Sequence, residues 1–252
     1  MPGFSGQGIV TVAPRQANGL PGVFRDVGNA SVYKIGLAEE TVERNESRTG
    51  SRLPLRKLTK TQSGSLQIVI DEFNADNFSL ATRGVKTSVT SVTPVIGYSL
   101  PPLVALGDKV IVPSKNISAV TIRDSTPTTP KVVPPASYTV DAFTGEITFV
   151  DLTTGGPYVQ PFRADYTPGA HTVIGAFKGA TNQEYYIRLT GINTDTGARG
   201  VHDTFRVRIP PAKVLDLISN DYLDFDFDGV VLADLTRQST DPEGQFYSFT
   251  PA

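Results

Sequence analysis

The chain has 252 residues and a mass of 27.0 kDa, which suits one large or two small domains with a substantial hydrophobic core. It contains no cysteine, which excludes disulfides, thiolate metal ligands and thiol nucleophiles. Its formal net charge of −2 is too balanced for a protein that binds nucleic acid or an anionic membrane with its whole surface.

The amino-terminal sequence MPGFSGQGIVTVAP has no charged segment followed by an apolar run, so no secretory signal is expected. No later stretch approaches the roughly 18 apolar residues that a transmembrane helix needs. We therefore expect a soluble protein made without an ordinary export signal.

Apolar residues alternate with polar ones along most of the chain, which predicts strands. Phe205, Val207 and Ile209, for example, share one face of a strand while the arginines between them point the other way. Many short strands, with frequent Gly and Pro, predict an all-β sandwich or barrel. Strands are expected at about 31–44, 57–71, 85–97, 109–112, 118–124, 137–141, 146–150, 162–168, 171–178, 184–193, 201–209, 230–236 and 245–249.

One short α-helix is expected at about 74–83, packed on the sheet. Asn74 can cap its first turn, and Phe73 and Phe78 are spaced for a hydrophobic staple. Gly84 suits the left-handed position that often follows a helix. Because so short a helix is unstable alone, it must gain its stability from the sheet.

A long basic loop joins the first two predicted strands, at about 45–56. From 44 to 60 the chain has six basic residues against one acid, a net charge of +5. Ordering about 12 residues costs on the order of 12 to 24 kcal/mol, and exposed ion pairs return only about 0.2 to 1 kcal/mol each. We expect a flexible arm that becomes ordered when its side chains contact another chain; a surface loop that is merely mobile is the alternative. The residues expected to make this contact are Arg48, Arg52, Leu53, Leu55, Arg56 and Lys57.

The carboxyl-terminal region has the opposite charge. From 216 to 252 there are eight acids and one base, a net charge of −7. DFDFDG at 224–229 fits the start of a calcium-binding loop, but Leu235 stands where that loop requires a Glu, so an alternating strand is favoured. Unlike patches on one subunit predict head-to-tail contacts between copies, although each patch could simply be a solvated surface.

Catalytic residues are scarce, and no enzyme activity, metal or cofactor is expected. A hydrolytic triad would need His171 or His202, and neither lies near a nucleophile elbow. A carboxylate pair for glycoside cleavage is spatial and cannot be judged from sequence, but the chain has no Trp to line a sugar groove.

Residues 100–170 are richer in Pro, Thr and Gly than the rest. Within them SYTVDAFTGEITFV predicts a hairpin that turns at Thr144–Gly145. The segment could be an embedded β-rich elaboration of a single domain covering 1–252, which we adopt as the expectation, or a small inserted β-domain.

Together these features resemble the tail tube proteins, or major tail proteins, of long-tailed bacteriophages. The resemblance lies in FRDVGNASVYKIGLAEETVERNESRTGSRLPLRKLTKTQSGSLQIVIDEFNADNFSLATRG, which has a Gly-Asn turn, a strand, a long loop, a second strand and a short helix closing on Gly. SYTVDAFTGEITFV and LDFDFDGVVLADLT are similar to later hairpins and the final strands of some of these proteins.

The resemblance implies a structural virion protein, made in the host cytoplasm, that self-assembles into hexameric rings. Stacked rings form a hollow tail tube, joined to other tail proteins at its ends, through which double-stranded DNA is ejected into the host. The loop at 45–56 would then contact a neighbouring ring, and edge strands would pair within a ring.

A conduit for DNA should be neutral or acidic inside, because a basic lining would hold the phosphates. Acidic residues are therefore expected to face the lumen or the next ring, and these are Asp224, Asp226, Asp228 and Asp234. For the first three, pairing across the sheet with Arg206 and Arg208 is the alternative.

Two rival functions remain open at the level of sequence. One is a monomeric β-sandwich binding module or adhesin that recognises a sugar or a surface protein through loops of the 100–170 segment. The weaker rival is a glycan hydrolase that uses two acids.

Overall fold

The computed structural model describes residues 5–48, 50–90, 93–220 and 222–251. Antiparallel strands dominate and the expected all-β class, with one short α-helix, is confirmed. In chain order the elements are β1 (Gly6–Pro14), β2 (Arg25–Asp26), β3 (Ala30–Asn45), β4 (Pro54–Ile70), α1 (Ala75–Ala81), β5 (Val85–Val89), β6 (Val95–Ser99), β7 (Lys109–Ile111), β8 (Ser118–Arg123), the 3-10 turn η1 (Pro135–Ser137), β9 (Tyr138–Asp141), β10 (Glu146–Phe149), β11 (Arg163–Thr167), β12 (His171–Gly175), β13 (Tyr185–Asn193), β14 (Arg199–Arg208), β15 (Phe225–Val231) and β16 (Tyr247–Pro251).

The chain divides into two compact units. The first comprises Met1–Val85 and Ile174–Ala252, and the second comprises Lys86–Val173. Each has a hydrophobic cluster of its own. The segment expected at 100–170 therefore belongs to an inserted unit with its own core, rather than to an elaboration of a single domain.

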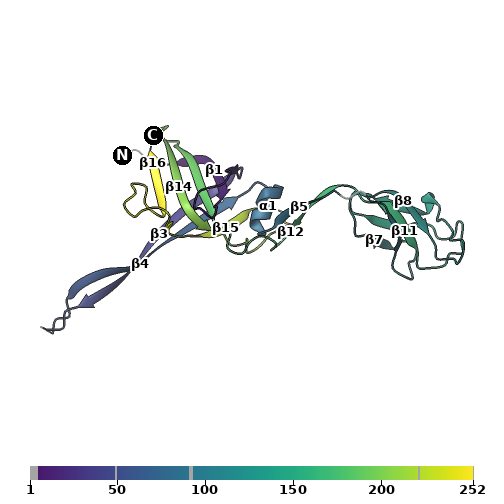
Figure 1. The fold of residues 1–252 in the computed structure, drawn as a ribbon, viewed down its shortest axis with the longest axis horizontal. Coiled ribbons are helices and arrows are strands. Elements are labelled where there is room, and N and C mark those ends of the chain that lie inside the picture. The colour runs from purple at the N-terminus through teal and green to yellow at the C-terminus, as the bar shows by residue number, and fades with distance from the viewer. Residues whose placement is uncertain (1–4, 49, 91–92, 221, 252) are drawn as a thin grey trace. The chain divides into compact units, whose positions relative to one another are not determined.

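One large sheet forms the first unit, in the order β2-β1-β13-β14-β15-β4-β3, with β16 beside the first half of β14 (Figure 1). Its core lies where the alternating strands turn their apolar faces inward. Leu66, Ile68 and Ile70 of β4 lie opposite β15, whose Phe225 and Phe227 are also buried.

Strand β1 precedes the first of the strands located by alternation. It pairs with β13 along its whole length, from Gly6↔Asn193 to Pro14↔Tyr185. Val10 and Val12 are buried. β15 begins at Phe225 and ends at Val231, which confirms the alternating strand favoured for 224–229; the separate strand expected at 230–236 does not extend beyond Val231.

Helix α1 has the expected amino-terminal cap. The Asn74 side chain accepts hydrogen bonds from the backbone N–H groups of Asp76 and Asn77, at 3.0 and 2.8 Å, and the rings of Phe73 and Phe78 are 5.8 Å apart.

The carboxyl-terminal end of α1 differs from the expectation in one respect. The left-handed residue is Arg83, with φ of 47°, and not Gly84. The Gly84 N–H donates to Ser79 O at 2.7 Å, and the Arg83 N–H donates to Leu80 O at 3.2 Å, which is the Schellman pattern. Gly84 is required by space, since a Cβ there would lie 2.8 Å from Ile174 Cγ2.

The two ends of the loop expected at 45–56 are paired as part of a β-hairpin. The β3–β4 ladder continues to Asn45↔Pro54, so that only residues 46–53 connect the strands. The hairpin extends past the rest of its sheet (Figure 1). Pairing across the ladder stabilises the ends of this segment, in addition to the ion pairs weighed from the sequence.

The second unit is built from two three-stranded sheets, β6-β11-β8 and β7-β10-β9. Strands β9 and β10 form the expected hairpin, and Gly145 in its turn has a φ of 74°. The rings of Phe149 and Phe162 stack at 5.0 Å in its core. Asp124, which is fully buried, accepts hydrogen bonds from the N–H groups of Lys131 and Val159.

Candidate assembly surfaces

The outer part of the β3–β4 hairpin has no cover from its own chain. Every residue of β4 from Pro54 to Ser63 is exposed, and so is every residue of β3 from Gly36 to Asn45 except Thr41. At about 3.3 Å per residue, the exposed part of β4 is roughly 33 Å long. We call residues 39–62 the arm.

Several apolar side chains on the arm are exposed to solvent. Leu53, Leu55 and Leu58 are 63%, 60% and 70% exposed, and Val42, which lies directly opposite Leu58, is 50% exposed. Burying a leucine fully is worth about 1.5 to 3 kcal/mol. In a single copy the arm therefore leaves apolar surface exposed, and burying that surface against a partner would be favourable.

The charges of the arm are only partly matched within the hairpin. Lys57 lies 3.6 Å from Glu43, and Lys60 lies 3.5 Å from Glu40, both across the ladder. Arg44 is directly opposite Arg56. Like charges facing each other across a ladder are destabilising, so this pair favours an anionic partner.

The structure brings the expected arm residues together. Arg48, Arg52 and Leu53 lie in the connection 46–53, and Leu55, Arg56 and Lys57 lie on the adjoining part of β4. Val42 and Leu58 complete the apolar surface. Val42 was not predicted as a contact residue, because it joins this apolar surface through strand pairing and not through its position in the sequence.

Three of the four expected acids lie at the surface. Asp226 and Asp228 project from the outer face of β15, where every second residue is exposed, and Asp224 precedes that strand and is also exposed. Gln67 donates to Asp226 at 3.1 Å, and Lys213 pairs with Asp228 at 2.7 Å.

The alternative pairing of these acids with Arg206 and Arg208 is wrong. Arg206 pairs with Glu184 at 2.6 Å, and Arg208 donates to the Thr181 carbonyl at 3.4 Å. The cause is register: β14 pairs with β15 only at Val207↔Val231 and Arg208↔Val230, beyond the aspartates.

The expectation for Asp234 is also wrong. Its side chain is 4% exposed and lies 2.5 Å from Arg15, which in turn approaches Glu184 at 3.5 Å. Burial would raise the pKa of Asp234, but hydrogen bonds from Thr236 and the Arg15 charge outweigh it and lower this pKa. Asp234 is part of a buried ion-pair network and cannot face a lumen or a neighbouring ring.

An exposed apolar loop before β15 was missed. Val214 and Leu217 are each 66% exposed, Ile218 is 99% exposed and Tyr222 is 95% exposed. Leu215 and Leu223 pack inward on the core. The run VLDLI could have indicated this apolar loop from the sequence. The region was instead interpreted by its net negative charge.

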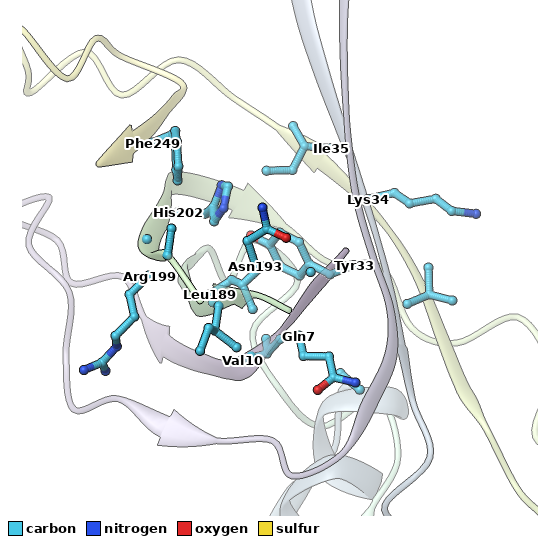
Figure 2. Close-up of a pocket in the computed structure, with 18 of the residues that line it drawn as sticks. Gln7, Val10, Tyr33, Lys34, Ile35, Leu189, Asn193, Arg199, His202 and Phe249 are labelled. Atoms are coloured by element: carbon cyan, nitrogen blue, oxygen red, sulfur yellow. The ribbon is translucent and has the colours of Figure 1, made fainter. Parts of the chain in front are cut away.

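A groove of about 620 Å³ lies between the first half of β1, the start of β3 and the β13–β14 end of the sheet (Figure 2). Tyr33 and Ile35 point into it, while Lys34 between them points to the other side of β3. His202 stacks on Phe249 at 4.5 Å, and its Nδ1 is hydrogen-bonded to the Tyr247 hydroxyl.

The chemistry of the groove is apolar. Burial lowers the pKa of His202, which favours the neutral imidazole at neutral pH. Burial also raises the pKa of Tyr33 to about 12. The lining residues that the structure describes include no Asp or Glu, so His202 has no carboxylate there to orient it as a general base.

Among the residues that the structure describes, no three or more His, Cys, Asp and Glu side chains lie together in a group suited to a metal. Nor does this part of the chain contain a helix with the length and apolar content needed to cross a membrane.

The chain belongs to the family described as Protein of unknown function UCP028589, whose model matches residues 3–250. The match spans both compact units. A search of curated proteins gave no match.

Proposed function

We propose that this protein is a non-enzymatic structural subunit that self-assembles, and that the assembly is the hollow tail tube of a long-tailed bacteriophage. The arm is the observation that supports the proposal most strongly. It is a long two-stranded hairpin that exposes three leucines and a cluster of arginines.

The arm gains little stability from the rest of its own subunit. Isolated two-stranded hairpins are marginally stable in water, and the arm has exposed side chains on both strands. Its ion pairs are at the surface, where each is worth about 0 to 1 kcal/mol. Contact with a second copy would bury the leucines and screen Arg44 from Arg56.

The proposed assembly is a stack of hexameric rings in which the arm contacts the neighbouring ring. Edge strands, such as the outer side of β3 at the end of the sheet, would pair within a ring, which also protects them from aggregation. Double-stranded DNA would pass through without specific binding, and other tail proteins would meet the tube at its ends. The protein would act in the virion, after synthesis in the host cytoplasm.

Negative-stain microscopy of the purified chain over a range of concentrations tests this proposal. We expect rings or tubes from the full chain. Deletion of residues 50–55 should leave circular dichroism unchanged and abolish stacking. Persistent monomers of the full chain at every concentration would refute the proposal, and normal tubes from the deletion variant would remove the arm from the mechanism.

A second candidate is a binding module that uses loops of the second unit. In that unit Leu103 is 87% exposed at a φ of 63°, and Leu106 is 65% exposed. The Gln160 amide accepts from Val104 N–H and donates to Val104 O, at 2.6 and 2.7 Å, which fixes the loop between the two leucines.

Backbone strain at an exposed leucine favours a recognition role for this loop. On this alternative, the full chain should bind host-cell envelopes in a sedimentation assay, and Leu103→Ser with Leu106→Ser should abolish that binding while leaving the chain monomeric.

A further inference from the structure

We propose that the arm of one copy docks on a surface formed by residues 214–220, Tyr222 and the outer face of β15 of the next copy. We call this the loop–β15 surface. The inference rests on the proposed self-assembly, and it identifies which part of the neighbour receives the arm.

The loop–β15 surface combines exposed apolar and acidic side chains. Leu217, Ile218 and Tyr222 are among its most exposed apolar residues. Asp224 follows Tyr222 closely in the chain, Asp226 lies on the outer face of β15, and both are exposed. The ion pair of Lys213 with Asp228, at 2.7 Å, places the start of the loop against the outer face of β15.

This loop is anchored at both ends. The Ala212 N–H donates to Ala81 O at 2.8 Å, at the end of α1. Phe225 pairs with Ile70, and its ring stacks on Phe73 at 5.9 Å. Fixed ends reduce the entropy lost when the loop is covered, although its middle projects almost fully into solvent.

The arm and the loop–β15 surface lie on different halves of β4. The arm includes Pro54–Gln62 of that strand, whereas β15 pairs with Gly64–Ile70 and its acidic end, at Phe225, lies opposite Ile70. The 17 residues of β4 span roughly 56 Å at about 3.3 Å per residue. The arm therefore cannot reach the surface of its own chain.

Two complementary patches on different halves of one long strand suit a head-to-tail contact between copies. Such a contact is heterologous, so it propagates from copy to copy until the geometry closes or a filament forms.

The arm and the loop–β15 surface are complementary in both their apolar and their charged side chains. The leucines of the arm match the apolar residues of the loop, and Arg44 and Arg56 match Asp224 and Asp226. In the free subunit the two arginines face each other, and acidic partners would relieve that repulsion. Desolvated charge pairs across an interface also fix its register.

A charge exchange tests the contact. The arm variant carries Arg44→Glu and Arg56→Glu, and the surface variant carries Asp224→Lys and Asp226→Lys. Each alone should raise the concentration needed for assembly by at least about 10-fold, which corresponds to about 1.4 kcal/mol per contact.

An equimolar mixture of the two variants should restore assembly, because each arm then meets a surface of opposite charge. The four substitutions in one chain should also restore it. The matched control places Asp195→Lys, at an exposed acid of the β13–β14 turn, with the arm variant, and it should restore nothing.

Cross-linking gives a readout that does not depend on the extent of assembly. Because the chain has no native cysteine, Leu58→Cys and Ile218→Cys can be made in separate chains and mixed under mild oxidation. We expect an intermolecular disulfide from this pair and none from Leu58→Cys mixed with Leu106→Cys.

The outcomes separate this inference from the proposed function. Wild-type assembly without recovery in the mixture, or without the specific cross-link, would overturn the docking assignment while self-assembly stands. Wild-type chains that remain monomeric at all concentrations would overturn both.

Discussion

Replacing Leu55 and Leu58 with Ala should weaken assembly and leave the subunit intact. Both are exposed in the single copy, by 60% and 70%, so their loss creates no cavity. Substitutions at such positions usually change the free energy of unfolding by less than about 0.5 kcal/mol. The urea midpoint and circular dichroism of the double variant should therefore match those of the wild type.

The effect on assembly follows from the area that a partner would cover. Each Leu→Ala change removes three carbons, worth about 2.4 kcal/mol at about 0.8 kcal/mol per carbon. About two thirds of each side chain is still available for burial, which leaves about 1.5 kcal/mol per residue. The pair then contributes about 3 kcal/mol, or roughly a 100-fold change in the association constant.

Sedimentation of assembled material against protein concentration measures this change. We expect the threshold concentration of the double variant to rise by roughly 100-fold. Leu106→Ala is the matched control, since Leu106 is 65% exposed but lies in the second unit. An unchanged threshold for the double variant, or an equal rise in the control, would refute the assignment of the arm as an apolar contact.

Three further predictions concern the folded subunit. Asp234→Ala should lower the free energy of unfolding by about 1 to 3 kcal/mol because Arg15 loses its 2.5 Å partner and keeps only Glu184, at 3.5 Å; Asp226→Ala, at an exposed site, should change it by less than about 0.5 kcal/mol, and equal urea midpoints would contradict this. Burial opposes ionisation of Asp124, but hydrogen bonds from Thr126, Val159 and Lys131 outweigh it and lower its pKa from 3.8 to about 2. The charged form is thus favoured in the folded state, so its contribution is present above about pH 4 and is lost as the pH falls towards 2; the urea midpoint of Asp124→Asn should fall less between pH 5 and pH 2.5 than that of the wild type. Asn74→Ala should cost about 1 kcal/mol by removing the cap of α1, with Asn74→Ser retaining most of the stability in the same urea titration.

The local features of the fold could be predicted because they depend on neighbours in the sequence. Alternation located most strands, including the one that buries Phe205 and Val207. The cap of α1 was predicted because Asn74 lies only two and three residues before the N–H groups it accepts from. The extent of β1 could not be predicted, because its Gly-rich start shows little apolar alternation and its bounds are set by pairing with β13.

For the candidate surfaces, sequence gave the composition and not the placement. The basic residues of the arm were identified, but the ladder to Asn45↔Pro54 that extends them depends on pairing between strands. Asp234 shows the same limit. A count of acids placed it with Asp226 and Asp228, whereas contact with Arg15, distant in sequence, buries it.

The sequence by itself determined the β-rich class, the capped helix and the separation of a basic segment from an acidic one, because periodicity, capping and charge are properties of neighbouring residues. Only the tertiary structure decided that residues 86–173 form a unit with its own core. It also decided that Val214, Leu217 and Ile218 are exposed and that the arm and the acidic strand lie on different halves of β4. Burial and register depend on contacts between residues far apart in the chain, and those contacts exist only once the strands have paired.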